Sequence, residues 1–227
     1  MSGSVAERLA SVRERVAAAC ARAGRPVESV TLVAVSKLKP ADLIREAYAA
    51  GQRDFGENYA QELRDKAAEL EGLEGLRWHA IGALQTNKVK YVARAAGAFH
   101  ALDRLEVARE LSKRREGAPP LPVYVEVNVG GEATKSGLAP DALGVFLDEV
   151  RALPGLQAVG LMALPPPTEE EARARADFQA LRELARVHGL PGLSMGTTHD
   201  FEWAIEEGAT VVRVGTAIFG ERALKSP

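Results

Sequence analysis

The stretch Val30-Thr31-Leu32-Val33-Ala34-Val35-Ser36-Lys37 decides how this chain folds. Its branched apolar residues are typical of a strand that is buried on both faces, as in parallel sheets. Lys37 stands where that strand ends, and in barrels and doubly wound sheets the functional side chains gather at the carboxyl ends of the strands. Lys37 is therefore either a solvated residue that closes a strand or an amine that forms a Schiff base with a carbonyl compound.

Composition limits what can be built around this lysine. The chain has 227 residues, of which 46% are hydrophobic, and this is enough for one well-buried core. We therefore expect a single domain over residues 1–227. The formal net charge is −2 and the basic residues are dispersed, which argues against a nucleic acid or a membrane surface as partner. Small neutral or anionic ligands fit this balance better.

Cysteine content and the N-terminus indicate the compartment. Cys20 is the only cysteine, so the chain can form neither an internal disulfide nor a cysteine-based metal cluster. We expect it to pack in the core. Residues 1–8 lack the apolar core of a signal peptide, and no stretch approaches the length of a membrane span. These features predict a cytoplasmic protein.

Periodicity divides the chain into alternating strands and helices. Apolar residues from Val5 to Cys20 recur at helical spacing after a possible cap at Ser4, which predicts a helix ahead of the first strand. Further strands are expected at 53–55, 76–82, 98–102, 123–129, 156–162, 192–195 and 210–214. Helices are expected at 40–50, 58–70, 86–95, 103–115, 140–153, 168–188, 199–208 and 215–220. In the helix over 58–70, we expect Tyr59, Leu63 and Leu70 to face inward.

Eight such alternations with short connections predict an α/β fold, a single (β/α)8 TIM barrel with an additional N-terminal helix. The alternative is an open doubly wound sheet. That fold usually has fewer strands and carries a glycine-rich fingerprint after the first one, where this chain has Lys37-Leu38-Lys39-Pro40. The barrel is therefore the preferred prediction.

A second informative stretch follows the last two strands. Many barrels bind phosphate there, on backbone N–H groups near a short extra helix. The segments 194–198 and Gly215-Thr216 have glycines and hydroxyls at these places, although such residues also serve as ordinary turn and cap residues. Arg213 lies two residues before Gly215 and shares its face of the strand, so it can point inward. The other interpretation of Arg213 is an ion pair inside the barrel.

A phosphate site together with an amine from the first strand fits a phosphorylated aldehyde, and the cofactor of that kind is pyridoxal 5′-phosphate (PLP). In this interpretation Lys37 meets the aldehyde and Arg213 lies where the pyridine nitrogen would be.

Seven motifs spread over nearly the whole chain carry a family resemblance. They are residues 34–37, Phe55-Gly56-Glu57-Asn58-Tyr59, 78–88, Lys135-Ser136-Gly137, 160–163, 193–196 and 213–220. With them the chain resembles the pyridoxal phosphate homeostasis protein family, which is similar to the N-terminal barrel of alanine racemase. The resemblance implies that Lys37 holds PLP as an aldimine and that the family serves vitamin B6 and amino-acid balance, with no firmly established catalysis.

The resemblance also implies the remaining site residues. Ser194, Gly215 and Thr216 would hold the phosphate, and Arg213 would face the ring nitrogen. Asn58, His79 and Met162 would line the cofactor less directly. The segment Thr197-Thr198-His199-Asp200 departs from the family pattern, but Thr198 keeps a hydroxyl there, so we expect phosphate binding to survive. His199 is either a helix-cap residue or a neighbour of the ligand, and we expect the cap.

Three functions use these residues differently. An arginine cannot accept the proton of a pyridinium, so it leaves PLP a weak electron sink and favours a carrier or regulator over an enzyme. The alternative, a PLP-dependent amino-acid racemase, needs a second base; the chain ends at Pro227 without the further domain that supplies it in barrel racemases, leaving His79 or His199. An aldolase would use Lys37 without PLP and Glu126 as its carboxylate. We expect a monomer, with PLP-dependent apo-enzymes as possible recipients.

Overall fold

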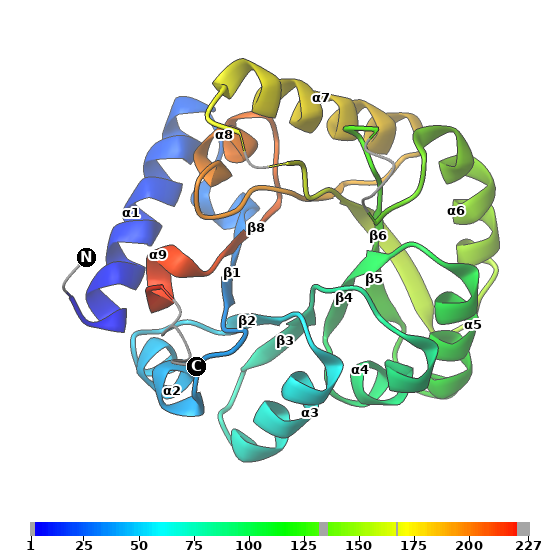
Figure 1. Ribbon diagram of the computed structural model, residues 1–227, viewed down its shortest axis with the longest axis horizontal. Coiled ribbons are helices and arrows are strands. Elements are labelled where there is room, and N and C mark those ends of the chain that lie inside the picture. The colour runs from blue at the N-terminus through cyan, green and yellow to red at the C-terminus, as the bar shows by residue number, and fades with distance from the viewer. Residues whose placement is uncertain (1–2, 132–135, 167, 222–227) are drawn as a thin grey trace, which may run out of the picture.

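The computed structural model describes residues 3–131, 136–166 and 168–221, and in these residues eight parallel strands pair in chain order into a closed barrel (Figure 1). The strands are β1 (Thr31–Val35), β2 (Asp54–Glu57), β3 (Arg77–Ala80), β4 (Ala98–Leu102), β5 (Leu121–Glu126), β6 (Leu156–Met162), β7 (Gly192–Ser194) and β8 (Val211–Val214). Each expected strand is present. The predicted (β/α)8 barrel is confirmed.

Helices surround the barrel as an outer layer (Figure 1). They are α1 (Val5–Arg22), α2 (Ala41–Ala49), α3 (Ala60–Glu69), α4 (Val89–Ala95), α5 (Leu105–Arg114), α6 (Leu143–Arg151), α7 (Glu171–Val187), α8 (Phe201–Glu206) and α9 (Thr216–Phe219). Short 3₁₀ turns precede β1, α4 and α6, namely η1 (Val27–Ser29), η2 (Thr86–Lys88) and η3 (Pro140–Ala142). None of the described helices has the combination of length and apolarity needed to cross a bilayer.

The additional N-terminal helix α1 forms as the sequence predicts. The Ser4 hydroxyl accepts a hydrogen bond from the Glu7 backbone, and the Glu7 carboxylate accepts one from the Ser4 backbone, which is a capping box. The apolar face of α1 is buried, including Cys20. Because α1 lies beside α8 and α9, it seals the side of the barrel where the chain closes on itself (Figure 1).

Barrel closure brings the two candidate site stretches together, the turn with Lys37 and the turn that begins at Gly215. In β1, Ala34 pairs with Val214 of β8 on one side and with Phe55 of β2 on the other. The turn that carries Lys37 and the turn that begins at Gly215 therefore leave the barrel from neighbouring strands at the same end. A methyl group on Gly215 would lie 3.3 Å from the Val35 carbonyl oxygen, so the two turns are in close contact.

Helix starts are where the expectations fail. The helix expected over 58–70 begins at Ala60, and Tyr59 is its N-cap residue with 54% of its surface exposed, so the prediction that Tyr59 faces inward is wrong. Leu63 and Leu70 are buried as expected. The helix expected at 199 begins at Phe201 with Asp200 as N-cap, so His199 is not the cap residue. Side chains in a strand-to-helix turn lie off the helical face that periodicity describes.

Candidate functional site

The Lys37 turn is held from beneath by hydrogen bonds. The Ser36 backbone N–H donates to Gly56 of β2, and the Lys39 N–H donates to the Ser36 carbonyl. Between them, Leu38 has φ +59°, a left-handed conformation that leucine rarely adopts. Its N–H donates to Glu62 Oε1 at 2.6 Å. The turn is thus fixed by its neighbours rather than by its own conformational preference, and it presents Lys37 half-buried at the mouth.

A buried cluster of charges supports this turn. Lys66 Nζ of α3 lies 2.7 Å from the Ser36 carbonyl oxygen, from Glu57 Oε1 and from Glu62 Oε1. Burial raises the pKa of Glu57, and the hydrogen bond from Lys66 partly opposes that rise. Because Lys66 binds the carbonyl one residue before Lys37, the cluster links α3 directly to the position of Lys37.

The two candidate site stretches share one hollow at this end of the barrel. It has a volume of about 250 Å³. Its lining comes from the ends of β1, β2, β3, β6, β7 and β8, and consists of Val35, Lys37, Asn58, Ile81, Met162, Leu164, Thr197, Thr198, His199, Arg213, Gly215 and Thr216. One lysine, one arginine and several hydroxyls therefore face the same space, which is the donor set for a ligand with a carbonyl group and an anionic group.

Arg213 is buried beside this hollow with neutral partners. Its Nη1 donates to the Ser194 hydroxyl at 2.5 Å and its Nη2 donates to the Ala163 carbonyl at 3.0 Å. Burial lowers the pKa of Arg213 to about 10, although Glu126 and Asp200 oppose this. The guanidinium remains charged at neutral pH. A buried cation with neutral hydrogen-bond partners stabilises a nearby acceptor or anion.

The turns after β7 and β8 meet through a hydrogen bond between a backbone N–H and a side-chain hydroxyl. The Gly215 N–H donates to Thr198 Oγ1 at 3.3 Å. Gly196 has φ +91°, and a methyl group there would lie 2.6 Å from the Ala204 side chain, so glycine is required for the β7 turn to pack on α8. Asp200 Oδ1 accepts from both the N–H and the hydroxyl of Thr197. These contacts fix the hydroxyls of the turn around the Gly215 backbone.

The structure brings most of the predicted site residues into this hollow. They are Lys37, Asn58, Met162, Arg213, Gly215 and Thr216. Ser194 and His79 are placed elsewhere, outside its lining. Ser194 is fully buried below Arg213, with its hydroxyl between Arg213 and His100 Nδ1, and His79 lies between Asp54 and His100. The motif residue Lys135 lies outside the described residues.

Sequence reasoning missed His100, which belongs to β4. In the sequence it is one polar residue in an apolar strand, a pattern that carries no functional signal. In the structure its ring is fully buried and stacks on Tyr124 at a centroid distance of 4.4 Å. Leu164 was also missed, because the loop after β6 has no motif beyond its prolines.

Two further hollows adjoin the first. One, of about 760 Å³, shares Leu164, Thr197 and His199 with it and extends over Trp203 of α8. The other, of about 280 Å³, shares Leu164 and contains Glu126, which accepts a hydrogen bond from Ser136 at 2.6 Å. Burial raises the pKa of Glu126. Glu126 thus lies in a different hollow from Lys37.

Fold and site together define a barrel of the kind found in alanine racemase. Residues 8–223 match the family described as alanine racemase, N-terminal domain. The chain is 50% identical to the pyridoxal phosphate homeostasis protein of Pseudomonas aeruginosa, over 99% of this chain and 98% of that one. It is 46% identical to the protein of the same name from Aquifex aeolicus, over 95% and 97%. The chain belongs to the pyridoxal phosphate homeostasis protein family.

A solved structure agrees with this assignment. PipY of Synechococcus elongatus, in a structure with PLP bound, has a TM-score of 0.82 and 38% identity to this chain. The alignment covers 95% of this chain and 100% of the PipY chain. The likeness therefore extends over the whole barrel.

Proposed function

We propose that this chain binds PLP in the hollow at the barrel mouth and serves the cellular homeostasis of PLP, and indirectly of amino acids. The observation that carries the proposal is that Lys37 and Arg213 line one hollow together with residues of the turns after β7 and β8. Membership of a family named for pyridoxal phosphate, and the PLP bound in PipY, support it.

The residues present fit this cofactor. The Lys37 amine adds to the aldehyde carbon, a C=N bond forms and water leaves, which makes the attachment covalent and reversible. Thr198, Gly215 and Thr216 provide hydroxyl and backbone N–H donors of the kind that bind phosphate. Arg213 faces the ring nitrogen as a hydrogen-bond donor. Asn58 and Met162 bound the remaining space.

Arg213 also argues for a carrier rather than an enzyme. When bound, PLP supplies an electron sink whose strength depends on protonation of its ring nitrogen. A guanidinium donates hydrogen bonds and cannot take up a proton, so it keeps that nitrogen unprotonated. The proposed site therefore retains PLP without promoting long-lived carbanions. We infer that PLP-dependent apo-enzymes receive the cofactor from it.

The proposal also covers the oligomeric state of the protein and its cellular compartment. We propose a cytoplasmic monomer in which residues 1–227 form a single domain. The free, fully buried Cys20 suits a reducing compartment.

An absorbance spectrum tests the proposal. The purified protein supplied with PLP should show the visible band of a Schiff base, and borohydride should remove the band and leave a mass increment on the peptide that contains Lys37. Lys37→Ala should abolish both signals. Lys39→Ala is the matched control, because Lys39 lies two residues away and its Nζ donates to the Glu221 carbonyl. Equal labelling of both variants would reject Lys37 as the attachment point.

A racemase remains the second candidate because His199 lines the same hollow as Lys37. The predicted alternative base, His79, is engaged with Asp54 and His100 instead. Incubation with alanine in deuterated water decides between the candidates. A carrier leaves the α-proton unexchanged, whereas sustained exchange that His199→Ala abolishes would establish the racemase.

A further inference from the structure

A chain of hydrogen bonds crosses the interior of the barrel and ends at Arg213. Asp54 of β2 contacts His79 Nε2 of β3 at 2.9 Å, and His79 Nδ1 contacts His100 Nε2 of β4 at 2.9 Å. His100 Nδ1 contacts Ser194 Oγ of β7 at 2.8 Å, and Ser194 Oγ contacts Arg213 Nη1 of β8 at 2.5 Å. Five strands thus contribute one side chain each to a continuous chain.

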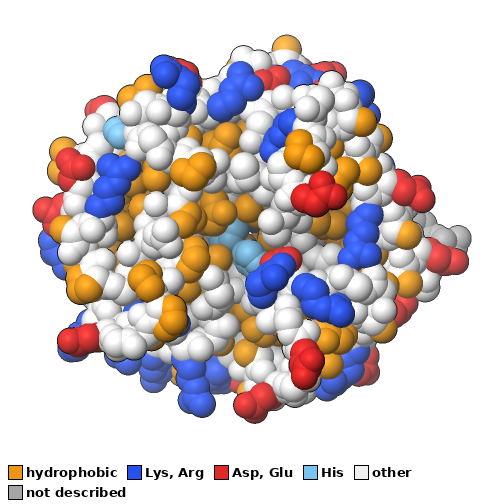
Figure 2. Space-filling view, turned by 180° about the vertical axis from the view of Figure 1, so that it is seen from behind, with side chains coloured by type: hydrophobic (Ala, Val, Ile, Leu, Met, Phe, Trp, Pro, Cys, Tyr) orange, Lys and Arg blue, Asp and Glu red, His pale blue; other side chains and the backbone are white. Residues whose placement is uncertain are grey.

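The chain runs from one end of the barrel to the other. Asp54 is the first residue of β2, so it lies at the end opposite Lys37, where it also pairs with Arg77. Figure 2 shows histidine side chains at the centre of one face of the molecule, beside acidic and basic side chains. At the other end, Arg213 lines the hollow that contains Lys37.

The two ends determine where every hydrogen in the chain lies. Arginine can only donate, so Ser194 accepts from Arg213 and gives its own hydrogen to His100 Nδ1. His100 then carries its hydrogen on Nε2 and donates to His79 Nδ1. His79 carries its hydrogen on Nε2 and donates to Asp54, which as a carboxylate can only accept. Each contact has one donor and one acceptor, with none left over.

The reversed order leaves one contact without a hydrogen bond and one hydroxyl hydrogen without an acceptor. If His100 carried its hydrogen on Nδ1, Ser194 would accept from both His100 and Arg213, and its hydroxyl hydrogen would have no acceptor in the chain. His79 would then donate to His100 from Nδ1 and turn a bare Nε2 toward the Asp54 carboxylate. Lone pairs facing each other in the barrel interior are costly, so Asp54 selects the first order.

The charges of these groups agree with this order. Burial raises the pKa of Asp54, but hydrogen bonds from His79 and Arg77 outweigh that effect and hold its pKa at about 2. Burial, with His79 and Arg213 nearby, lowers the pKa of His100 well below its ordinary value. At neutral pH, the chain therefore has an anion at one end, a neutral His100 within it, and the Arg213 cation at the other end.

We propose that His100 and Ser194 are positioning residues for Arg213: with their hydrogens ordered by Asp54 through His79, they fix the orientation in which the guanidinium meets the ring nitrogen of PLP. The inference rests on the proposed function, because it assigns a task to Arg213 within that site. In this inference Ser194 orients Arg213 and does not bind the phosphate. The phosphate is bound by Thr198, Gly215 and Thr216 in the turns after β7 and β8.

Comparison of PLP with pyridoxal, which lacks the phosphate, separates these two tasks of Ser194. The readout is the Schiff-base absorbance on titration with each compound. Because Arg213 meets the ring that both share, Ser194→Ala should raise both dissociation constants by about tenfold, the effect of losing one hydrogen bond to a charged group. Ser194→Thr keeps the hydroxyl and should restore binding. Thr198→Ala should weaken the binding of PLP while leaving that of pyridoxal unchanged.

A matched control comes from Ser112 of α5, another buried serine, whose hydroxyl donates to the Pro154 carbonyl far from the hollow. Ser112→Ala should bind both compounds as the unaltered protein does. A loss in Ser194→Ala that is confined to PLP would show that Ser194 holds the phosphate and would overturn the inference.

Histidine tautomers provide a second test that needs no cofactor. Nitrogen-15 chemical shifts of the histidine-labelled protein at neutral pH should report His100 as a neutral ring with hydrogen on Nε2, and His79 with hydrogen on Nε2. In Asp54→Asn the hydrogens of His79 and His100 should no longer be confined to Nε2, since an asparagine amide can donate as well as accept. Hydrogen on Nδ1 of His100 in the unaltered protein would refute the proposed chain, even if PLP binds. Failure of PLP to label Lys37, with the tautomers as expected, would reject the proposed function alone.

Discussion

A single side chain, that of Lys66, stabilises the turn that carries Lys37. The turn contains a left-handed Leu38, and its neighbour Ser36 is tied to Lys66 and Glu57. Oε2 atoms of Glu57 and Glu62 are buried without a hydrogen-bond partner among the described residues. Two acids are therefore compensated by one lysine, and removal of that lysine leaves them exposed to the low dielectric of the interior.

Lys66→Met should lower the free energy of unfolding by about 3 kcal/mol, because it leaves uncompensated buried carboxylates. The double variant Lys66→Met/Glu57→Gln should recover part of that loss, since the fully buried carboxylate is then neutral. Urea unfolding measures both. If Lys66→Met unfolds like the unaltered protein, the cluster contributes nothing to the stability of the turn.

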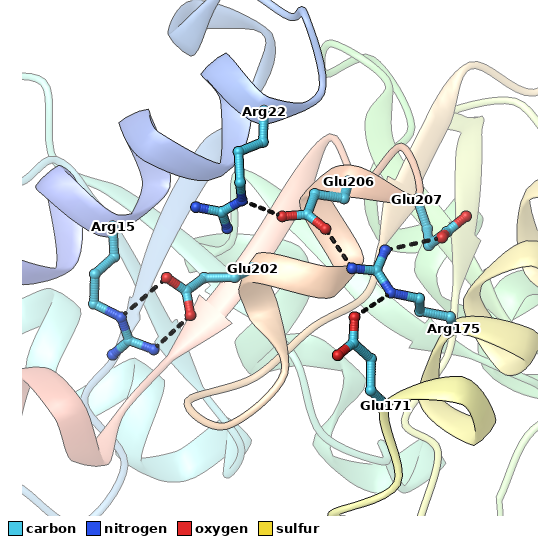
Figure 3. A network of polar contacts seen from close by, with 7 residues as sticks. All are labelled: Arg15, Arg22, Glu171, Arg175, Glu202, Glu206 and Glu207. Carbon is cyan, nitrogen blue, oxygen red and sulfur yellow. Dashed lines mark hydrogen bonds and ion pairs between the residues drawn. The ribbon is translucent and has the colours of Figure 1, made fainter.

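Ion pairs join helix α8 to its neighbouring helices α1 and α7 (Figure 3). Arg15 and Arg22 of α1 pair with Glu202 and Glu206 of α8. Arg175 of α7 contacts Glu206, Glu207 and Glu171 at once. The network surrounds α8, which follows the β7 turn of the proposed phosphate site, so it stabilises the packing behind that turn.

Arg175→Met should lower the free energy of unfolding by about 1–2 kcal/mol, because three carboxylates lose a partly buried partner. Arg109→Met is the control: Arg109 pairs with Glu149 at the surface, with both side chains at least half exposed, and its loss should cost less than about 0.5 kcal/mol. Urea unfolding of the two variants in low and high salt measures the difference. Equal small effects would show that the network behaves as isolated surface pairs.

The barrel as a whole encloses a polar chain, and this makes its stability depend on pH. The pKa of His100 in the folded protein lies well below its ordinary value of 6.5. Below pH 6.5 the unfolded chain therefore binds more protons than the folded one, and stability falls as the pH decreases. Asp54, with its pKa held at about 2 instead of 3.8, extends the same trend below about pH 4.

Urea unfolding between pH 5 and 8 should show a free energy of unfolding that decreases below about pH 6.5, with a slope of at most about 1.4 kcal/mol per pH unit from His100. His100→Gln should flatten this part of the profile. His188→Gln, a change at the C-cap of α7, should keep it. A profile that His100→Gln leaves unaltered would assign the dependence to other groups.

Much of the fold and part of the candidate site could be predicted from local sequence. The branched run before Lys37, the capping residue Ser4 and the glycine turns are local signals, and the structure has the strand, the helix and the barrel that they indicate. The turns of Lys37 and Gly215 become neighbours once the barrel closes, because β1 and β8 must then pair.

Local sequence was sufficient to predict the order of strands and helices, the barrel and the two turns at its mouth, because periodicity and turn chemistry act over a few residues. Three features became visible in the folded chain: Tyr59 faces solvent, His100 belongs to a chain of hydrogen bonds, and Ser194 lies under Arg213. The physical reason is that hydrogen-bond partners such as His100 and Ser194 stand 94 positions apart in the chain. Such pairs meet inside the closed barrel, where no local pattern records them.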